Sequence, residues 1–306
     1  MFSVFDCHCD TVTIAIARNE DIYDNSLQLS LKRLTEFKRA FQIFAIWLDD
    51  EYVEKGFLNT IKAIDFFDDC LDKHRDIAEK ITENQQIEKC KKIGAILSIE
   101  GGEAIGEDID NINTLYNKGV RLCTLTWNRE NRLGYGAETG SDKPLKPFGI
   151  EALKRMESLK MIVDVSHLNR AGFLSVCEHS TRPFMATHSN AYALCGHYRN
   201  LTDDQLRMIG QTGSMVGINL YPPFLNESGQ ADINDILRHT EYMADILGDD
   251  KLCLGCDFDG IDYTPKGIDG VKDLYIIYEA FCNSFGKITA DRIFFDNMYD
   301  FAKKML

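Results

Sequence analysis

A single-domain (β/α)8 barrel, the TIM-type α/β fold, is the fold class that this 306-residue sequence predicts. The first observation is a series of short, mostly apolar runs, which are typical of parallel strands buried on both faces. The second is that stretches with helical spacing of apolar residues separate these runs. The third is that no linker rich in Pro, Gly or Ser divides residues 1–306. Eight such alternations in one chain indicate a closed barrel.

The runs give the expected strands in order. They are residues 4–6, 42–47, 95–99, 121–126, 161–165, 183–187, 214–219 and 251–255. Residues 60–92 form an amphipathic, helical stretch between the second and third runs. Thr202 and Gln205 form a capping box that predicts a helix start, and Gly213 predicts the end of that helix. Residues from about 264 to 306 are expected to form a closing helical section.

The composition argues against a nucleic-acid partner and against a membrane anchor. A net charge of −14, with no basic stripe and interleaved aromatics, argues against nucleic acid. No apolar run reaches the length of a membrane span, and no leader or lipid-anchor pattern is present, so we expect a cytoplasmic protein without a membrane anchor. The ten cysteines are scattered through apolar runs. We therefore expect reduced thiols in the core, Cys253 and Cys256 included.

Residue types that bind metals follow five of the expected strands. They are His8 and Asp10 after the first, Glu100 after the third, His167 after the fifth, His188 after the sixth and Asp257 after the eighth. Alternation along a strand would place His8 and Asp10 on one face. Because the carboxyl ends of barrel strands form the face that carries active sites, all these groups should converge there. Imidazoles together with carboxylates suit zinc.

Five ligands are too many for one tetrahedral zinc and suit two zinc ions with a shared bridge. A carboxylate bridges readily, so Glu100 is the expected bridge. The remaining ligands would pair as His8 with Asp10 on one ion and His167 with His188 on the other. A hydroxide shared by the ions would be the nucleophile, since metal binding lowers the pKa of water toward about 7. Asp257 suits proton transfer to the leaving nitrogen. The histidines expected at the surface are His74, His179 and His239.

The chain resembles the membrane (renal-type) dipeptidase family, peptidase family M19, a group of zinc dipeptidases with amidohydrolase-like barrels. The matching motifs, in order, are DCHCDT at 6–11, SIEGG at 98–102, TLTWN at 124–128, DVSH at 164–167, THSNA at 187–191, HYRN at 197–200, NLYPPF at 219–224 and CDFDG at 256–260. The resemblance implies a binuclear zinc site on the same five ligands. It also implies a small dipeptide as substrate, L,D-dipeptides included.

The resemblance implies substrate-binding roles as well. Arg199 would bind the terminal carboxylate, a task that suits a guanidinium fork, although spacing alone leaves a surface salt bridge as the alternative. Asp257 would hold the free amino group in addition to its acid–base work. Tyr221 would line the pocket.

One position departs from the family pattern. After T-L-T many relatives carry a histidine that contacts the substrate, and here Trp127 takes that place at the pocket. An indole donates one hydrogen bond and takes neither a proton nor a metal. Asn128, Arg129 or the second metal would have to replace the missing contact. The loop of residues 129–148, rich in Gly and polar residues, is expected to be a lid or specificity loop.

Two alternatives stay open on the sequence. A deaminase or cyclic amidase of the same barrel class would usually open with His-x-His and carry a modified lysine after the fourth strand, whereas this chain has His-x-Asp and Trp127. A catalytically weak, metal-binding relative is supported by Trp127 alone. A homodimer is a further expectation, because exposed barrel helices often pair.

Overall fold

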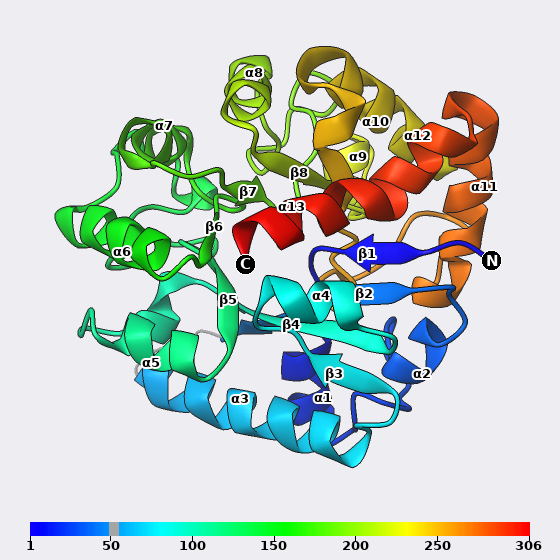
Figure 1. The fold of residues 1–306 in the computed structure, drawn as a ribbon. Helices are drawn as coiled ribbons and strands as arrows, with labels where there is room; N and C mark the ends of the chain where they lie inside the picture. Colours follow the sequence, from blue (N-terminus) through cyan, green and yellow to red (C-terminus); the bar gives the residue numbers. More distant parts are fainter. Residues whose placement is uncertain (49–54) are drawn as a thin grey trace.

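Eight parallel strands close into a barrel at the centre of the molecule, with helices packed around it (Figure 1). The structure is a computed structural model that describes residues 1–48 and 55–306. In this part of the chain the strand order is β2-β1-β9-β8-β7-β6-β5-β4-β3, and a pairing between β2 and β4 closes the ring. The predicted single-domain TIM-type barrel is confirmed.

The barrel strands lie where the apolar runs predicted them. Their bounds are β1 Val4–Asp6, β2 Ala40–Trp47, β4 Ile93–Glu100, β5 Val120–Thr124, β6 Ile162–Asp164, β7 Met185–Ala186, β8 Met215–Ile218 and β9 Leu252–Leu254. Every residue of β4 is buried, because one face of each strand points into the barrel and the other lies under helices. Ile96 accordingly belongs to the interior cluster and Leu97 to the outer one.

One strand was not expected from the sequence. The helical stretch predicted at 60–92 instead forms α3 (Gly56–Lys73), β3 (Ala78–Lys80) and α4 (Asn84–Lys89). Among the described strands β3 pairs with β4 alone, so it lies outside the closed ring. Its sequence, Ala-Glu-Lys, lacks the apolar run that identifies a buried strand.

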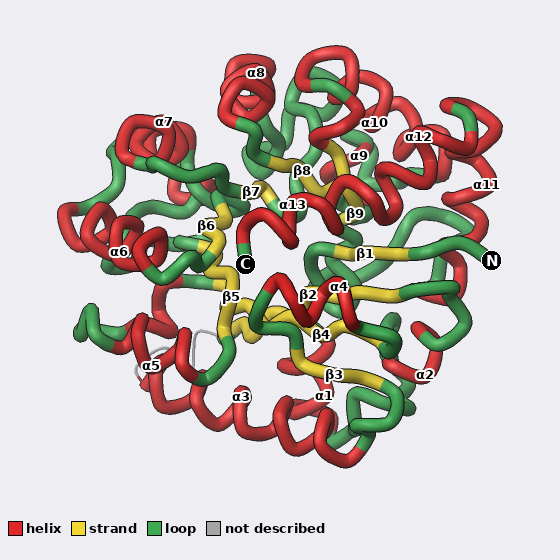
Figure 2. Tube along the Cα trace, viewed as in Figure 1, coloured by secondary structure: helices red, strands yellow, loops and turns green. Residues whose placement is uncertain are grey.

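Helices alternate with the barrel strands (Figure 2). Their bounds are α1 Thr11–Arg18, α2 Leu31–Leu34, α5 Asn111–Asn117, α6 Pro147–Ser158, α7 Arg170–His179, α8 Asp203–Thr212, α9 Pro222–Leu225, α10 Ile233–Leu247, α11 Leu274–Phe285 and α12 Lys287–Asp291. The predicted capping box is present, because the Thr202 hydroxyl accepts from the N–H of Gln205 and Gln205 Oε1 accepts from the N–H of Thr202. Gly213 ends α8 with a left-handed φ of 72°.

The C-terminal helix closes the end of the barrel at which the strands begin. α13 (Asn297–Met305) follows a π-helical turn, Arg292–Asp296, and passes beside α4 across the barrel (Figure 1). Its Met298 and Phe301 belong to the buried cluster inside the barrel, which also contains Phe5 near the start of β1. The opposite end, where the strands finish, is left for a site.

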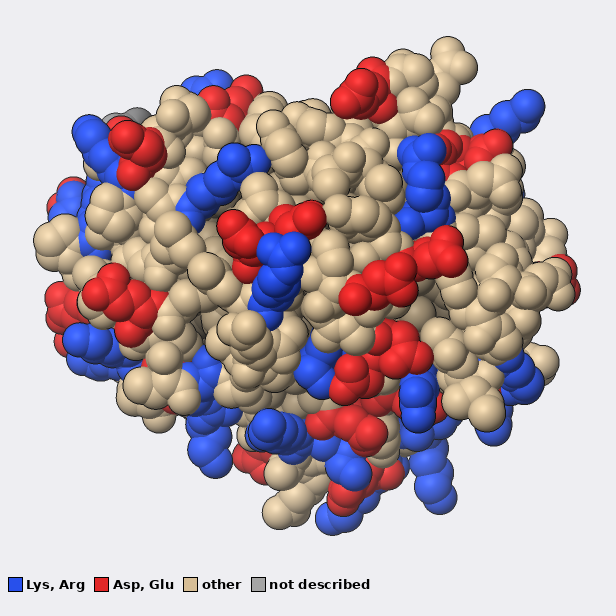
Figure 3. All heavy atoms as spheres, turned by 90° about the horizontal axis from the view of Figure 1, so that it is seen from above, with Lys and Arg blue, Asp and Glu red and all other residues tan. Residues whose placement is uncertain are grey.

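The charge distribution on the surface and the state of the cysteines match what the composition predicted. Basic and acidic side chains are interspersed on the face drawn in Figure 3, with no continuous basic stripe on its described residues. No helix within 1–48 and 55–306 is both long and apolar enough to cross a membrane. All ten cysteines are free and eight are buried, Cys253 and Cys256 among them, which confirms the core interpretation.

Candidate active site

Six side chains of metal-binding type meet at the carboxyl ends of the barrel strands. They are His8, Asp10, Glu100, His167, His188 and Asp257. Each is at most 8% exposed. Carboxylates and imidazoles are rarely buried together unless they share protons or a metal ion. The convergence that the strand-end positions predicted is therefore present.

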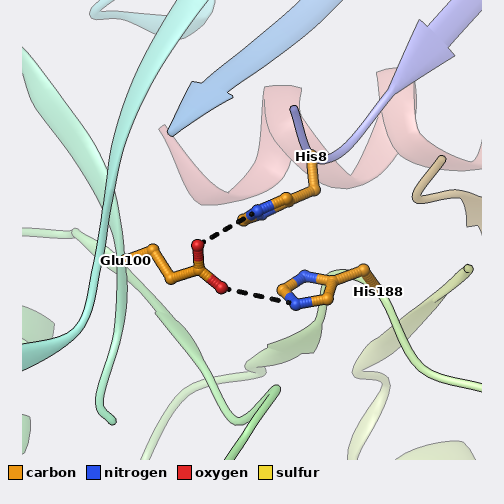
Figure 4. Close-up of side chains that lie close together, drawn as sticks. All are labelled: His8, Glu100 and His188. Atoms are coloured by element: carbon orange, nitrogen blue, oxygen red, sulfur yellow. Dashed lines mark ion pairs between the residues drawn. The ribbon is translucent and has the colours of Figure 1, made fainter. Parts of the chain in front are cut away.

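Glu100 lies at the centre of this cluster. It is the last residue of β4. Its Oε2 is 3.5 Å from His8 Nε2, and its Oε1 is 2.8 Å from His167 Nε2 and 3.5 Å from His188 Nε2. Figure 4 shows one carboxylate oxygen directed at His8 and the other at His188. A single carboxylate thus faces imidazoles from three strand ends, which is the placement that a bridging ligand needs.

His8 and Asp10 lie just beyond the end of β1 at Asp6 and flank Cys9, which forms an isolated parallel bridge with Phe258. The extended pairing therefore continues past the strand, and the two side chains point the same way, as predicted. The N–H of Asp10 donates to the carbonyl of Phe258, and the N–H of Asp257 donates to the carbonyl of His8. These bonds align the segment after β1 with the segment after β9. His8 Nε2 lies 3.5 Å from Asp10 Oδ2 and 3.8 Å from Asp257 Oδ1.

Polar neighbours set the tautomers of His167 and His188. His167 Nδ1 lies 2.8 Å from Asn128 Oδ1, which only accepts, so this Nδ1 carries the proton. His188 Nδ1 lies 2.8 Å from the hydroxyl of Thr187, whose own proton is donated to Asp164. The Thr187 oxygen therefore accepts from Nδ1. Both Nε2 atoms are left unprotonated and directed at the central carboxylate, as in metal-binding histidines.

The lone pairs in the cluster fit metal ions. The Nε2 atoms of His167 and His188 are 2.9 Å apart, where two unprotonated nitrogens repel unless a cation lies near both. Within the described residues, both ring nitrogens of His8 and Oδ1 of Asp10 are buried without a hydrogen-bond partner. Two groups have ligand atoms within 4.8 Å of one another, His8 with Glu100 and His188, and His8 with Asp10 and Asp257. Nitrogen and carboxylate donors in this combination suit zinc.

Burial and neighbouring charges shift the pKa values of the groups in the cluster. Burial opposes protonation of His8, yet the carboxylates of Glu100 and Asp10 raise its pKa well above the usual range. Burial lowers the pKa of His167 to about 4 and holds the pKa of His188 well below its usual range, so both rings are neutral at neutral pH. Burial opposes ionisation of Glu100, yet the adjacent His8 holds its pKa well below the usual range. Burial raises the pKa of Asp257 to about 7, against the opposing effect of His8.

Asp257 is held in a strained turn beside the cluster. Its backbone is left-handed, with φ of 62°, as is that of His167 at 65°. Asn219 Nδ2 donates to Asp257 Oδ2 at 2.8 Å, which leaves Oδ1 directed toward the ligands. A Cβ on Gly260 would lie 2.1 Å from Asp10 Oδ2 and 2.5 Å from Asp257 Oδ1, so this position requires glycine. Asn219 was not predicted, although it too follows a barrel strand, β8.

A cavity of about 760 Å³ opens onto the cluster, and Arg199 lines it. Arg199 is only 5% exposed, which rules out the surface salt bridge. Its Nη2 donates to the carbonyl of His188 at 3.4 Å, its guanidinium lies 5.4 Å from the ring centroid of Phe224, and Nε has no hydrogen-bond partner among the described residues. No carboxylate of the described chain lies within ion-pair distance. A buried cation with unused donors suits an anionic group of a ligand.

Aromatic side chains form part of the cavity wall. Tyr221 lines it and donates its hydroxyl proton to Asp262 at 3.2 Å. Trp127 lines it as well, with its ring centroid 4.9 Å from that of Trp47 and 6.3 Å from that of His167. Trp47 was not predicted as a site residue. Its position at the end of β2 could have identified it, because residues at the ends of barrel strands face the site.

The loop of residues 129–148 does not line the cavity, contrary to expectation. It packs against the turn that carries a ligand, because the N–H of Ala137 donates to the carbonyl of His167 at 2.7 Å. Asn169, after the same turn, donates from Nδ2 to the carbonyls of Ser141 and Lys143. These contacts make the loop a support for the His167 turn rather than a lid.

The prediction that His239 lies at the surface is wrong, because its side chain is fully buried. Its Nδ1 accepts from the N–H of Ala191 at 3.1 Å, and its Nε2 donates to the carbonyl of Leu225 at 3.0 Å. The signal was present, since His239 follows Ile236 by three residues on the apolar face of α10. His74 and His179 are partly exposed.

Comparison with known families agrees with this geometry. The model of the membrane dipeptidase family (peptidase family M19) matches residues 1–297. The chain belongs to peptidase family M19. It is therefore a hydrolase of the metallo-dipeptidase type, which confirms the resemblance and leaves a deaminase or cyclic amidase without support.

Two bacterial relatives show how far the similarity extends. A protein described as "Uncharacterized protein in pqqA 5'region" from Klebsiella pneumoniae is 35% identical over 227 residues, or 69% of this chain and 83% of its own length. A protein described as "Uncharacterized protein in PQQ-III 3'region" from Acinetobacter calcoaceticus is 33% identical over 283 residues, or 79% of this chain and 89% of its own.

Two solved structures share the whole fold. A metallopeptidase from Rhodobacter sphaeroides, bound to a phosphinate mimic of the dipeptide L-Ala-D-Ala, has a TM-score of 0.92 and 27% identity, covering 100% of this chain and 99% of that one. A metallopeptidase of family M19, dipeptidase AC, has a TM-score of 0.92 and 28% identity, covering 99% and 98%.

Proposed function

We propose that this protein is a zinc dipeptidase that uses two zinc ions to hydrolyse the single peptide bond of small dipeptides, L,D-dipeptides included. The observation that carries the proposal is the buried cluster of facing lone pairs beside the buried cation Arg199. The residues that would hold the ions are His8, Asp10, Glu100, His167 and His188. When bound, such ions polarise a peptide carbonyl and lower the pKa of water toward about 7.

Arg199 would bind the C-terminal carboxylate of the substrate. Its guanidinium lines the cavity and has an unused Nε donor, so two parallel hydrogen bonds to a carboxylate would satisfy it. The distance from Arg199 to the ligand cluster is set by the barrel, because the loop that carries it is tied to His188. A longer peptide would place no carboxylate there and would leave a buried charge unpaired. This is a physical reason for selecting dipeptides.

Asp257 would handle the amino end and the proton. Its Oδ2 is occupied by Asn219, so Oδ1 is the oxygen available to a substrate. That oxygen lies beside the ligands, where it would take a proton from the attacking water and deliver it to the leaving nitrogen. The same carboxylate would attract the free amino group. Tyr221 and Trp127 would contact the substrate as parts of the cavity wall.

The relative from Rhodobacter sphaeroides supports the inclusion of L,D-dipeptides among the substrates, since its structure holds a mimic of L-Ala-D-Ala. The free, buried cysteines support action in the reducing cytoplasm. The homodimer stays a prediction that light scattering on the purified protein tests.

The metal is tested by removal and return. The purified protein is dialysed against a chelator and assayed on L-Ala-D-Ala and L-Ala-L-Ala. It is then reloaded with known amounts of zinc and assayed again. We expect activity to vanish and to return as the zinc content reaches two ions per chain by elemental analysis. Full activity in metal-free protein would refute the proposal.

The substrate class is tested on the same preparation. L-Ala-D-Ala is compared with its C-terminal amide and with a tripeptide of alanines. We expect the dipeptide to be turned over far faster than either its amide or the tripeptide. No turnover of any dipeptide by zinc-loaded protein would favour the catalytically weak, metal-binding alternative.

A further inference from the structure

A pair of tryptophans forms one side of the cavity wall. Trp47 ends β2, and Trp127 follows β5. Both strands pair with β4, whose last residue is Glu100, so the two indoles flank the central carboxylate. Their ring centroids are 4.9 Å apart with planes inclined at 54°, and both side chains line the cavity. The pair is therefore a continuous aromatic surface beside the reacting centre.

Both indoles are carried by backbone that is held in place. The Thr13 hydroxyl donates to the carbonyl of Trp47 at 3.0 Å and accepts from its N–H at 3.1 Å. At Gly136 a Cβ would lie 2.3 Å from the carbonyl oxygen of Trp127, so the supporting loop packs directly on that backbone. A wall fixed before the substrate arrives costs little ordering on binding.

The order of the strands decides which end of the substrate meets this wall. Around the closed ring, β4 lies opposite β8. Arg199 follows β7, which lies opposite the β2 strand of Trp47, and its neighbour Phe224 follows β8, which lies three strands from β5, the strand before Trp127. The proposed carboxylate site is therefore separated from the indoles by the width of the cavity at Trp47 and by two to three strands at Trp127. The scissile bond must lie over the ligands between them. The side chain on the tryptophan side therefore belongs to the N-terminal residue of a dipeptide.

We propose that Trp47 and Trp127 form the subsite for the N-terminal side chain and select bulky apolar side chains there. This inference rests on the proposed dipeptidase function and names its substrate class. Ile14, next to Thr13 on α1, lines the cavity too and adds a third apolar group. Two indoles and an isoleucine bury hydrocarbon well and offer little to a carboxylate, whereas an indole ring attracts a cation, so an acidic side chain is the contrast that tests this wall. Each apolar group that fills such a pocket raises kcat/KM by about 10- to 200-fold.

The test is the ratio of kcat/KM for L-Phe-D-Ala to that for Gly-D-Ala, with L-Glu-D-Ala and L-Leu-D-Ala completing the series. If the enzyme prefers a C-terminal L-alanine, the series uses that instead. We expect a ratio above about tenfold in the unaltered protein. Trp47→Ala and Trp127→Ala should each bring it down at least fivefold. Because each ratio is internal to one preparation, a partly misfolded variant still gives a valid value.

Two further variants complete the design. Trp127→Leu retains an apolar wall and should keep most of the ratio. Tyr275→Ala removes an aromatic ring that is 50% exposed on α11 and does not line the cavity, so its ratio should equal that of the unaltered protein.

The outcomes separate the two levels of the proposal. Unchanged ratios in both alanine variants, or faster cleavage of L-Glu-D-Ala than of L-Phe-D-Ala, would overturn the subsite while leaving the dipeptidase intact. Failure of the unaltered, zinc-loaded protein to cleave any member of the series would overturn the proposed function and this inference with it.

Discussion

Replacement of Arg199 by alanine gives the sharpest test of how the site selects its substrate. In the structure this guanidinium is 5% exposed, donates one long bond of 3.4 Å to a carbonyl and has no described carboxylate within ion-pair distance. A hydrogen bond to a charged group contributes about 1.5–3 kcal/mol, so its loss should raise KM by roughly 10- to 150-fold. A carboxylate remote from the scissile bond would be bound equally in the ground and transition states, so kcat should change far less.

The same change makes an unusual prediction for stability. A buried cation without a counter-charge costs free energy in the folded state, and burial lowers the pKa of Arg199 accordingly. Arg199→Ala should therefore leave Tm unchanged or raise it while binding collapses. Arg199→Lys, which keeps the charge and loses the planar fork, should give an intermediate KM.

The assay is Michaelis–Menten kinetics on L-Ala-D-Ala and its C-terminal amide, with thermal melting of each zinc-loaded variant. The preference for the free carboxylate should shrink in Arg199→Ala by the same factor as KM rises. A fall of several degrees in Tm with KM unaltered would refute the reasoning, because it would show a structural cation rather than a substrate-binding one.

Three other perturbations test separate parts of the site and core. Asp257→Asn should mainly lower kcat, by about 10²- to 10⁴-fold, with a smaller rise in KM from the lost attraction to the amino group, and an equal effect on both constants would contradict its proton-transfer role. Gly260→Ala should cut the zinc content, because the added Cβ would lie 2.1 Å from Asp10 Oδ2, and full occupancy by elemental analysis would contradict this. Burial lowers the pKa of His239 to about 4, so folding excludes its proton, and stability is complete above pH 6.5 and falls as the pH drops toward 4, by about 3 kcal/mol at most. His239→Gln, which can keep both hydrogen bonds, should flatten urea-unfolding stability across that range, and an unchanged pH dependence would assign the loss to other groups.

Individual site residues differ in whether the sequence or only the structure revealed their position. The strand ends predicted the six converging groups because a parallel barrel places all its carboxyl ends on one face, whatever lies between them in sequence. Arg199 was found through the family motif, yet its burial, which separates a ligand-binding cation from a surface one, came from the structure. β3 was missed because it has no apolar run, and His239 because a polar residue on a buried helix face needs partners that only other segments supply.

By itself, the sequence determined the barrel, the family and the chemical types of group at its rim, since these follow from local periodicity and from short motifs at strand ends. Only the tertiary structure decided how those groups meet. The order of strands around the ring places Glu100 among three imidazoles. It also places the strand of Trp47 opposite the strand that precedes Arg199. The left-handed turns at His167 and Asp257 aim their side chains inward. The physical reason is that these contacts join residues far apart along the chain, whose distances depend on packing rather than on neighbouring residues.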